Sequence, residues 1–138
     1  MKIIGHRLPS LLHIAVMVGI YAAAPTAFGQ GPARGQYDGS YQGKFNGSFA
    51  GNPAMGSVAF SVANGVITVT DPGHGTGNVD SSGSATFSGS LGLGNIACKF
   101  VGTFRSSTGA QRGVHASGSW SCMGAGQTGK GAWSADRQ

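Results

Sequence analysis

The feature that most constrains this chain is a two-residue alternation that begins near residue 39 and recurs to the C-terminus. Between residues 39 and 49, Tyr41, Phe45 and Phe49 share one parity with glycines, while serine, lysine and asparagine occupy the other. A period of two is typical of a β-strand with one buried face. Every Phe after residue 30 and both Trp fall on the parity assigned to the inner face. The pattern therefore predicts an all-β protein with an aromatic core.

Turn residues divide this pattern into eight predicted strands. Asn64-Gly65 is a strong hairpin signal and sets a register in which Val62 faces Ile67 and Phe60 faces Val69. The predicted strands span 39–49, 56–63, 66–70, 76–80, 84–91, 96–105, 113–122 and 129–135. Because the connections are short, we expect an antiparallel up-and-down meander, and pairing of the last strand with the first would remove both edges. We predict a small eight-stranded β-barrel; a two-sheet β-sandwich is the alternative.

Glycine is unusually abundant, with 26 glycines among 138 residues and no collagen-like period. Gly47, Gly102, Gly118 and Gly131 lie inside predicted strands on the inner parity, next to aromatic residues. A glycine there lets a bulky neighbour lie across the backbone and permits the bend that a small barrel needs. The alternative is that the missing side chains leave a ligand cavity. The number of inward aromatic rings favours a packed interior.

The N-terminus predicts export. Lys2 and Arg7 precede a mostly apolar run, which is followed by the small residues of Ala27-Phe28-Gly29. This order is typical of a secretory signal peptide. We predict a signal peptide over residues 1–29 and a single domain over residues 30–138, secreted or periplasmic in a bacterium.

The two cysteines fit an exported barrel. In an oxidising compartment, two cysteines most simply form one disulfide. If Cys98 faces Cys122, the same register pairs Phe100 with Trp120 on the inner face. We therefore predict a Cys98–Cys122 bridge between two neighbouring strands.

Residues suited to enzyme chemistry are scarce. After the predicted leader, the histidines are His74, in a turn, and His115, on an outward parity, and every acidic residue is an aspartate. No Gly-rich loop leads into a helix, and no serine lies in a nucleophile elbow. We predict a protein that is not an enzyme and has no cofactor and no metal site.

After the predicted leader, seven basic residues face four aspartates, and this net charge of +3 suggests an anionic partner; the alternative is a solvated surface that net charge keeps soluble. Lys44 and Arg105 are the basic residues that we single out for contact with an envelope surface or polysaccharide. The bases are scattered along the chain without interleaved exposed aromatics, so nucleic-acid binding is not expected. The outward parity is polar, so we do not expect the strands to span a membrane.

The ladder from Gly39 to Phe49 and the closing run Gly131-Ala132-Trp133-Ser134 resemble the GxYxGxF and GxW patterns of small secreted Gly-rich bacterial barrels. Transferrin-binding-protein-like and lipocalin-like barrels are the nearest named groups. The resemblance implies an exported barrel with a binding or accessory role. It identifies no functional residue.

These observations predict an exported, non-enzymatic binding or interaction module of the bacterial envelope, with a protein or glycan partner. One alternative is inhibition of a hydrolase, such as a protease or lysozyme, through the loop 71–75 or 108–112. A second alternative is carriage of a small apolar ligand between the two Trp side chains. The candidate binding residues are Trp120, Trp133, Lys44, Arg105 and His74.

Overall fold

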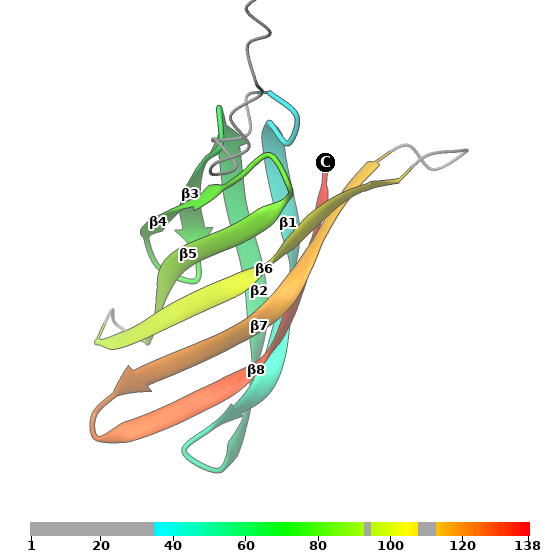
Figure 1. The fold of residues 1–138 in the computed structure, drawn as a ribbon. Coiled ribbons are helices and arrows are strands. Elements are labelled where there is room, and N and C mark those ends of the chain that lie inside the picture. Colours follow the sequence, from blue (N-terminus) through cyan, green and yellow to red (C-terminus); the bar gives the residue numbers. More distant parts are fainter. Residues whose placement is uncertain (1–34, 93–94, 108–112) are drawn as a thin grey trace, which may run out of the picture.

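The computed structural model describes residues 35–92, 95–107 and 113–138, which form eight antiparallel strands in a closed barrel. The strands are β1 (Gly39–Phe49), β2 (Asn52–Ala63), β3 (Val66–Asp71), β4 (Gly75–Val79), β5 (Ser84–Leu91), β6 (Ile96–Ser107), β7 (Gly113–Gly124) and β8 (Gln127–Arg137). Each strand pairs with the next, and β8 pairs with β1 (Figure 1). The predicted meander and its closure are confirmed, and the sandwich alternative is wrong. The predicted signal peptide over 1–29 lies outside the described residues.

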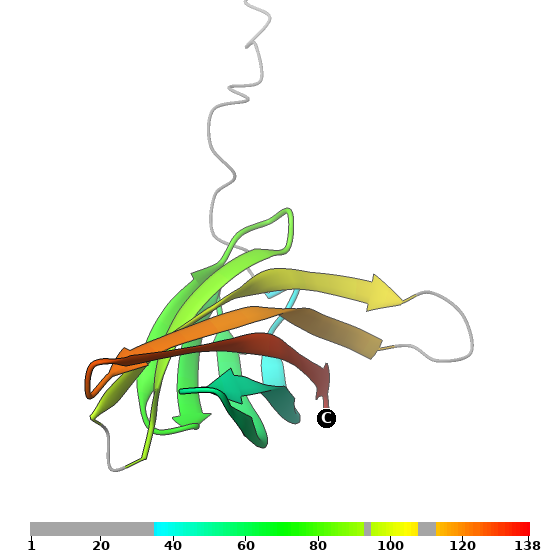
Figure 2. The ribbon, with the colours of Figure 1, turned by 90° about the horizontal axis from the view of Figure 1, so that it is seen from below.

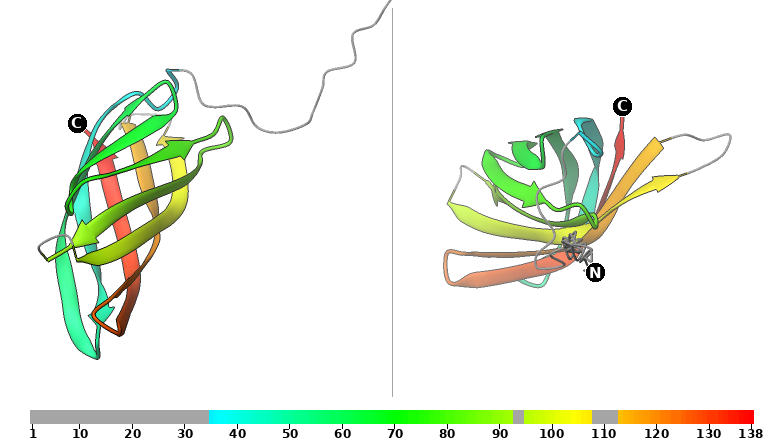
Figure 3. Two further views of the ribbon diagram at one scale, coloured as in Figure 1. Left: turned by 90° about the vertical axis from the view of Figure 1, so that its left-hand side faces the viewer. Right: turned by 45° about the horizontal axis from the view of Figure 1, so that its top comes forward.

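The two ends of the barrel carry different segments. Seen from below, the long strands β6, β7 and β8 form one curved wall of the barrel, with β1 to β4 across from it (Figure 2). The start of β1 and the end of β8 lie side by side at one end, where Tyr41 pairs with Arg137 (Figure 3). Antiparallel order places the β2–β3 and β4–β5 turns at that end too. The β1–β2, β3–β4 and β7–β8 turns lie at the opposite end.

Two-residue turns fix the register of three hairpins. Asn64 and Gly65 both have positive φ, at 50° and 80°, as a type I′ turn requires. The predicted pairs of Val62 with Ile67 and Phe60 with Val69 form as expected.

The other two tight turns were not predicted. Ala50-Gly51 joins β1 to β2 and Ala125-Gly126 joins β7 to β8, and all four residues have positive φ. Strand pairing continues up to these turns, so that Gly124 faces Gln127. The predicted strands 56–63, 113–122 and 129–135 are therefore too short at the ends next to these turns, since β2 begins at 52, β7 ends at 124 and β8 begins at 127. Alanine rarely adopts positive φ, so neither turn is signalled by the sequence.

The barrel interior is filled by hydrophobic side chains. None of the buried residues in the described part of the chain is polar or charged. The predicted inward aromatic residues are among them, and only Phe49 is partly exposed. The buried hydrophobic residues of the core are Tyr37, Tyr41, Phe45, Val58, Phe60, Val62, Ile67, Val69, Val79, Ala85, Phe87, Cys98, Phe100, Phe104, Val114, Ala116, Trp120, Cys122, Trp133 and Ala135.

Two Gly-x-Trp segments, 118–120 and 131–133, hold β7 and β8 to their outer neighbours. Trp120 lies directly opposite Gly131, and Trp133 lies directly opposite Gly118. Each indole extends past the facing glycine to the strand beyond it. The Nε1–H of Trp120 donates to the carbonyl of Asn46 on β1 at 3.0 Å, and that of Trp133 donates to the carbonyl of Val101 on β6 at 3.1 Å. Four adjacent strands, β6, β7, β8 and β1, are thereby tied together.

The glycines permit this close packing. A Cβ at Gly131 would lie 1.9 Å from the Asn46 carbonyl oxygen and 2.6 Å from Nε1 of Trp120. A Cβ at Gly102 would lie 2.7 Å from the Trp133 ring. Real Cβ atoms do not approach other atoms so closely. The prediction that inner-face glycines make room for a neighbouring ring is therefore confirmed at these positions.

The segment before β1 covers one end of the barrel. Tyr37 is buried, and its ring centroid lies 5.4 Å from that of Phe104. The hydroxyl of Tyr41 donates to the Tyr37 carbonyl at 2.7 Å. The carboxylate of Asp38 accepts from the backbone N–H of Asn64 at 2.9 Å, which attaches the β2–β3 turn to this segment. The alternation pattern, which starts at residue 39, did not identify Tyr37 as a core residue.

Replacing Gly131 by alanine should strongly destabilise the barrel. The new methyl group would collide with the Asn46 carbonyl and the Trp120 ring, so we expect a loss of about 2–3 kcal/mol in the free energy of unfolding, measured by denaturant titration. Gly113→Ala is the matched control, because a Cβ there meets nothing within 4 Å. It should change stability by less than about 0.5 kcal/mol. Equal effects of the two substitutions would contradict the packing described here.

The sulfur atoms of Cys98 and Cys122 lie at bonding distance between β6 and β7, in the predicted register and 24 residues apart in sequence. Replacing both by alanine should lower the free energy of unfolding by about 2–4 kcal/mol, because a bridge closing a loop of this length restricts the unfolded chain. The measurement is denaturant unfolding under oxidising conditions. The double variant should not respond to a reducing agent, whereas the wild type should. A wild type with the variant's stability would contradict the bridge.

Stability should fall at alkaline pH through Tyr41. Burial raises the pKa of Tyr41 from 10.0 to about 12, because desolvation disfavours the phenolate. The folded chain then holds this proton more tightly than the unfolded chain. The resulting contribution of Tyr41 to the free energy of unfolding is therefore complete below pH 10 and is lost as the pH rises towards 12. Tyr41→Phe loses the hydrogen bond to Tyr37, worth about 0.5–1.5 kcal/mol, but no longer titrates. In unfolding titrations from neutral pH upward, the wild type's advantage should shrink above pH 10; a constant difference would contradict this account.

Candidate functional site

The two tryptophans chosen as candidate binding residues are part of the core. Trp120 and Trp133 are 2% and 3% exposed, and both indole N–H groups donate to backbone carbonyls. The Trp133 ring also packs edge-on against Phe87, with centroids 5.1 Å apart. Within the described ranges, no buried side-chain nitrogen or oxygen lacks a hydrogen-bond partner. The inner face therefore offers no unused polar group that would orient a ligand.

The other three candidates lie far apart on the outside. Lys44 is exposed on the outer face of β1, opposite Ser57 and Ser134. Arg105 is exposed near the end of β6, and His74 is exposed in the β3–β4 turn at the opposite end of the barrel. The structure does not bring these residues together into one site.

The β3–β4 turn is packed onto the barrel. Pro72 is buried, and its carbonyl accepts from the backbone N–H of Ser90 on β5 at 3.0 Å. Gly73 lies against the same serine, since a Cβ there would be 1.9 Å from its hydroxyl oxygen. This turn has little length free to enter a foreign active site. The second loop considered for inhibition, 108–112, lies outside the described residues.

His115 and Asp136 form a cross-strand side-chain contact that the sequence did not predict. His115 Nδ1 lies 2.7 Å from Asp136 Oδ1, and Arg105 lies opposite His115 on the next strand. Both side chains of the pair are well exposed, at 52% and 70%. A carboxylate that orients a histidine is one part of a catalytic base, but both side chains of this pair are exposed rather than buried.

Each aspartate has a local partner. Asp80 accepts from the Ser82 hydroxyl and from the backbone N–H groups of Ser82 and Ser84. These hydrogen bonds lower the pKa of Asp80, and the one from the Ser82 hydroxyl has the largest effect. The other three pairs are Asp38 with the Asn64 N–H, Asp71 with the Ser57 hydroxyl and Asp136 with His115. The carboxylates therefore serve turns and cross-strand contacts.

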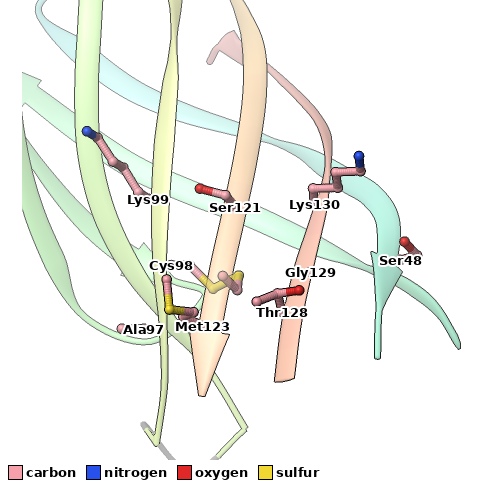
Figure 4. A pocket seen from close by; sticks show the side chains of 10 residues that line it. Ser48, Ala97, Cys98, Lys99, Ser121, Met123, Thr128, Gly129 and Lys130 are labelled. Atoms are coloured by element: carbon pink, nitrogen blue, oxygen red, sulfur yellow. A yellow bond between two sulfur atoms is a disulfide. The ribbon is translucent and has the colours of Figure 1, made fainter. Parts of the chain in front are cut away.

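One polar row crosses six strands on the outside of the barrel. We call it the belt, and strand register aligns its members from β4 through β5, β6, β7 and β8 to β1. All of its side chains are exposed. The belt residues are Thr76, Ser88, Lys99, Ser121, Lys130 and Ser48. Figure 4 shows Lys99, Ser121 and Lys130 next to one another on three adjacent strands.

Two open hollows follow the belt and meet at Lys99. One, of about 610 Å³, lies over β6, β7, β8 and the end of β1, and its polar lining includes Lys99, Ser121 and Lys130 (Figure 4). The other, of about 620 Å³, lies over β4 and β5, where Asn78, Thr86 and other polar side chains line it. Lys99 lines both hollows. Together they form an open surface that follows the belt from β4 and β5 over β6, β7 and β8 to the end of β1.

Lys99 and Lys130 are the functional candidates that sequence reasoning missed. They are 31 positions apart in the printed sequence and looked like scattered bases. The Cys98–Cys122 register already placed Lys99 opposite Ser121. The missing link was the pairing of Ser121 with Lys130, which depends on the Ala125-Gly126 turn. Recognition of that turn would have brought both lysines onto one row.

No protein-family model, curated protein or solved structure matches this chain. In the described ranges, no three His, Cys, Asp or Glu side chains gather in a way that could hold a metal ion. No helix in the same ranges is long and apolar enough to cross a membrane. Function must therefore be inferred from the geometry of the surface itself.

Proposed function

We propose that this protein is an exported, non-enzymatic glycan-binding module of the bacterial envelope, and that the belt is its binding surface. The observation that carries the proposal is the pair of open hollows that meet at Lys99, whose linings combine two lysines with the hydroxyl and amide groups of residues such as Ser121, Thr128 and Asn78. Such groups can donate to and accept from sugar hydroxyls. A small barrel with a cysteine pair at bonding distance is compatible with export.

The packed interior favours this surface over an internal ligand site. A carrier of an apolar ligand needs a cavity, whereas the Trp120 and Trp133 rings are in contact with strand backbone and with other rings. A protein partner would be expected to contact a larger apolar area. The exposed large hydrophobic residues among those described are Met55, Val66, Val101 and Met123, which lie on different strands.

Ser121→Tyr tests the site. The bulky ring would fill the surface between Lys99 and Lys130, so glycan binding should weaken by about tenfold or more, equivalent to about 1.4 kcal/mol. The measurement is binding of the purified protein to an array of bacterial envelope polysaccharides, followed by titration of those that bind. Ser61→Tyr is the matched control, because Ser61 is exposed on β2 and lines neither hollow.

The two variants separate the outcomes clearly. Loss of glycan binding only in Ser121→Tyr supports the proposal. Wild-type protein that retains no polysaccharide but pulls a defined envelope protein from native membranes would overturn it in favour of a protein partner.

A further inference from the structure

The belt carries two cations without partners. Among the described residues, neither Lys99 nor Lys130 makes a hydrogen bond or an ion pair with another side chain. Both are exposed on the same row, and only Ser121 separates them. Two strand spacings place their backbones about 10 Å apart. In Figure 4 the ammonium group of Lys99 points away from Ser121 on one side and that of Lys130 points away from it on the other.

Acidic groups are absent from this section of the surface. The Asp80 carboxylate lines the hollow over β4 and β5, but it accepts from the Ser84 N–H, four residues along β5 from the belt residue Ser88. Four residues of strand correspond to about 13 Å. No aspartate lines the hollow over β6 to β8. The positive potential there is therefore not neutralised locally.

Among the described residues, the belt has no exposed aromatic ring that would stack on sugars or bases, since Phe87, which borders the hollow over β4 and β5, is only 2% exposed. No Phe, Tyr or Trp in the described part of the chain is among its exposed large hydrophobic residues. Single-stranded nucleic acids bind through stacking on aromatic side chains as well as through charge. Neutral sugars likewise commonly rest on an aromatic ring. Recognition on the belt must instead rely on charge and hydroxyl groups.

Resting on the proposed glycan-binding function, we propose that the β6–β8 section of the belt binds acidic polysaccharides in which charged and neutral sugars alternate. Successive acid groups pair with Lys99 and Lys130, since the backbones of the two lysines lie two strand spacings apart, about 10 Å, a distance comparable to one disaccharide. The neutral sugar between them lies over Ser121, whose hydroxyl can donate to or accept from it. The chain direction is across the strands, along the two hollows.

The test uses the purified protein and a fluorescently labelled hyaluronan hexasaccharide, in which glucuronate alternates with N-acetylglucosamine. Lys99→Gln and Lys130→Gln should each weaken binding about three- to fivefold at low ionic strength, and the double variant by about the product of the two. Lys44→Gln is the matched control, because it removes the same charge from the outer face of β1 but lines neither hollow. It should change affinity less than about twofold.

Comparison ligands distinguish failure of this inference from failure of the proposed function. A neutral chitin hexasaccharide should bind much more weakly than hyaluronan. If it binds equally well and is lost in Ser121→Tyr, the belt is a glycan site but the acidic-ligand inference is overturned. If Lys44→Gln weakens binding as much as Lys99→Gln, only diffuse charge is involved, and the inference is also overturned. Tighter binding of single-stranded DNA with the same lysine dependence would overturn the assignment to a polysaccharide. Unchanged melting temperatures establish that all variants are folded.

Discussion

The barrel depends on the close approach of two tryptophan rings to glycine backbone. Trp120 and Trp133 face Gly131 and Gly118 across one strand pair, and each indole N–H reaches a carbonyl on the strand beyond. An ordinary side chain at Gly131 would occupy the space of the ring and of the neighbouring backbone. The large rings and the glycines that face them therefore form a single packing arrangement. It fills the interior and satisfies the two indole donors, and it ties together β6, β7, β8 and β1, which include the pair that closes the barrel.

This packing arrangement determines which face of the strands is available for function. The inner parity of each strand is occupied by packing, and the described buried set contains no polar residue. Only the outward-facing positions of the strands can carry different chemical groups, because the side chains there do not have to pack against one another. The four aspartates there contact turns or neighbouring strands, whereas Lys99 and Lys130 make no hydrogen bond or ion pair with another side chain in the described structure. Charged groups with no structural task on a rigid sheet are the natural candidates for recognition.

Sequence periodicity predicted the inner face because burial requires every second residue of a strand to be apolar. Two registers were predicted from specific signals, the Asn64-Gly65 turn and the cysteine pair. Periodicity could not predict the Ala50-Gly51 and Ala125-Gly126 turns. An alanine at positive φ is locally unfavourable, so the tertiary pairing of long strands must impose it. The belt was hidden for the same reason, since the Ser121–Lys130 pairing follows from the second of these turns. Tyr37 was missed because it precedes the alternating pattern and packs from outside the strands.

A belt of this kind is suited to a repeating ligand. An exposed lysine paired with an anion contributes only about 0.2–1 kcal/mol, and physiological salt screens exposed charges beyond about 8 Å. Two such pairs with a few hydroxyl contacts cannot give high affinity for a short oligosaccharide. A long polymer offers many equivalent positions for the same belt, and neighbouring protein molecules on one surface can bind the same chain. Under the proposed function, selectivity would come from spacing, because only a chain whose acid groups match the separation of Lys99 and Lys130 would pair with both lysines at once while lying over Ser121.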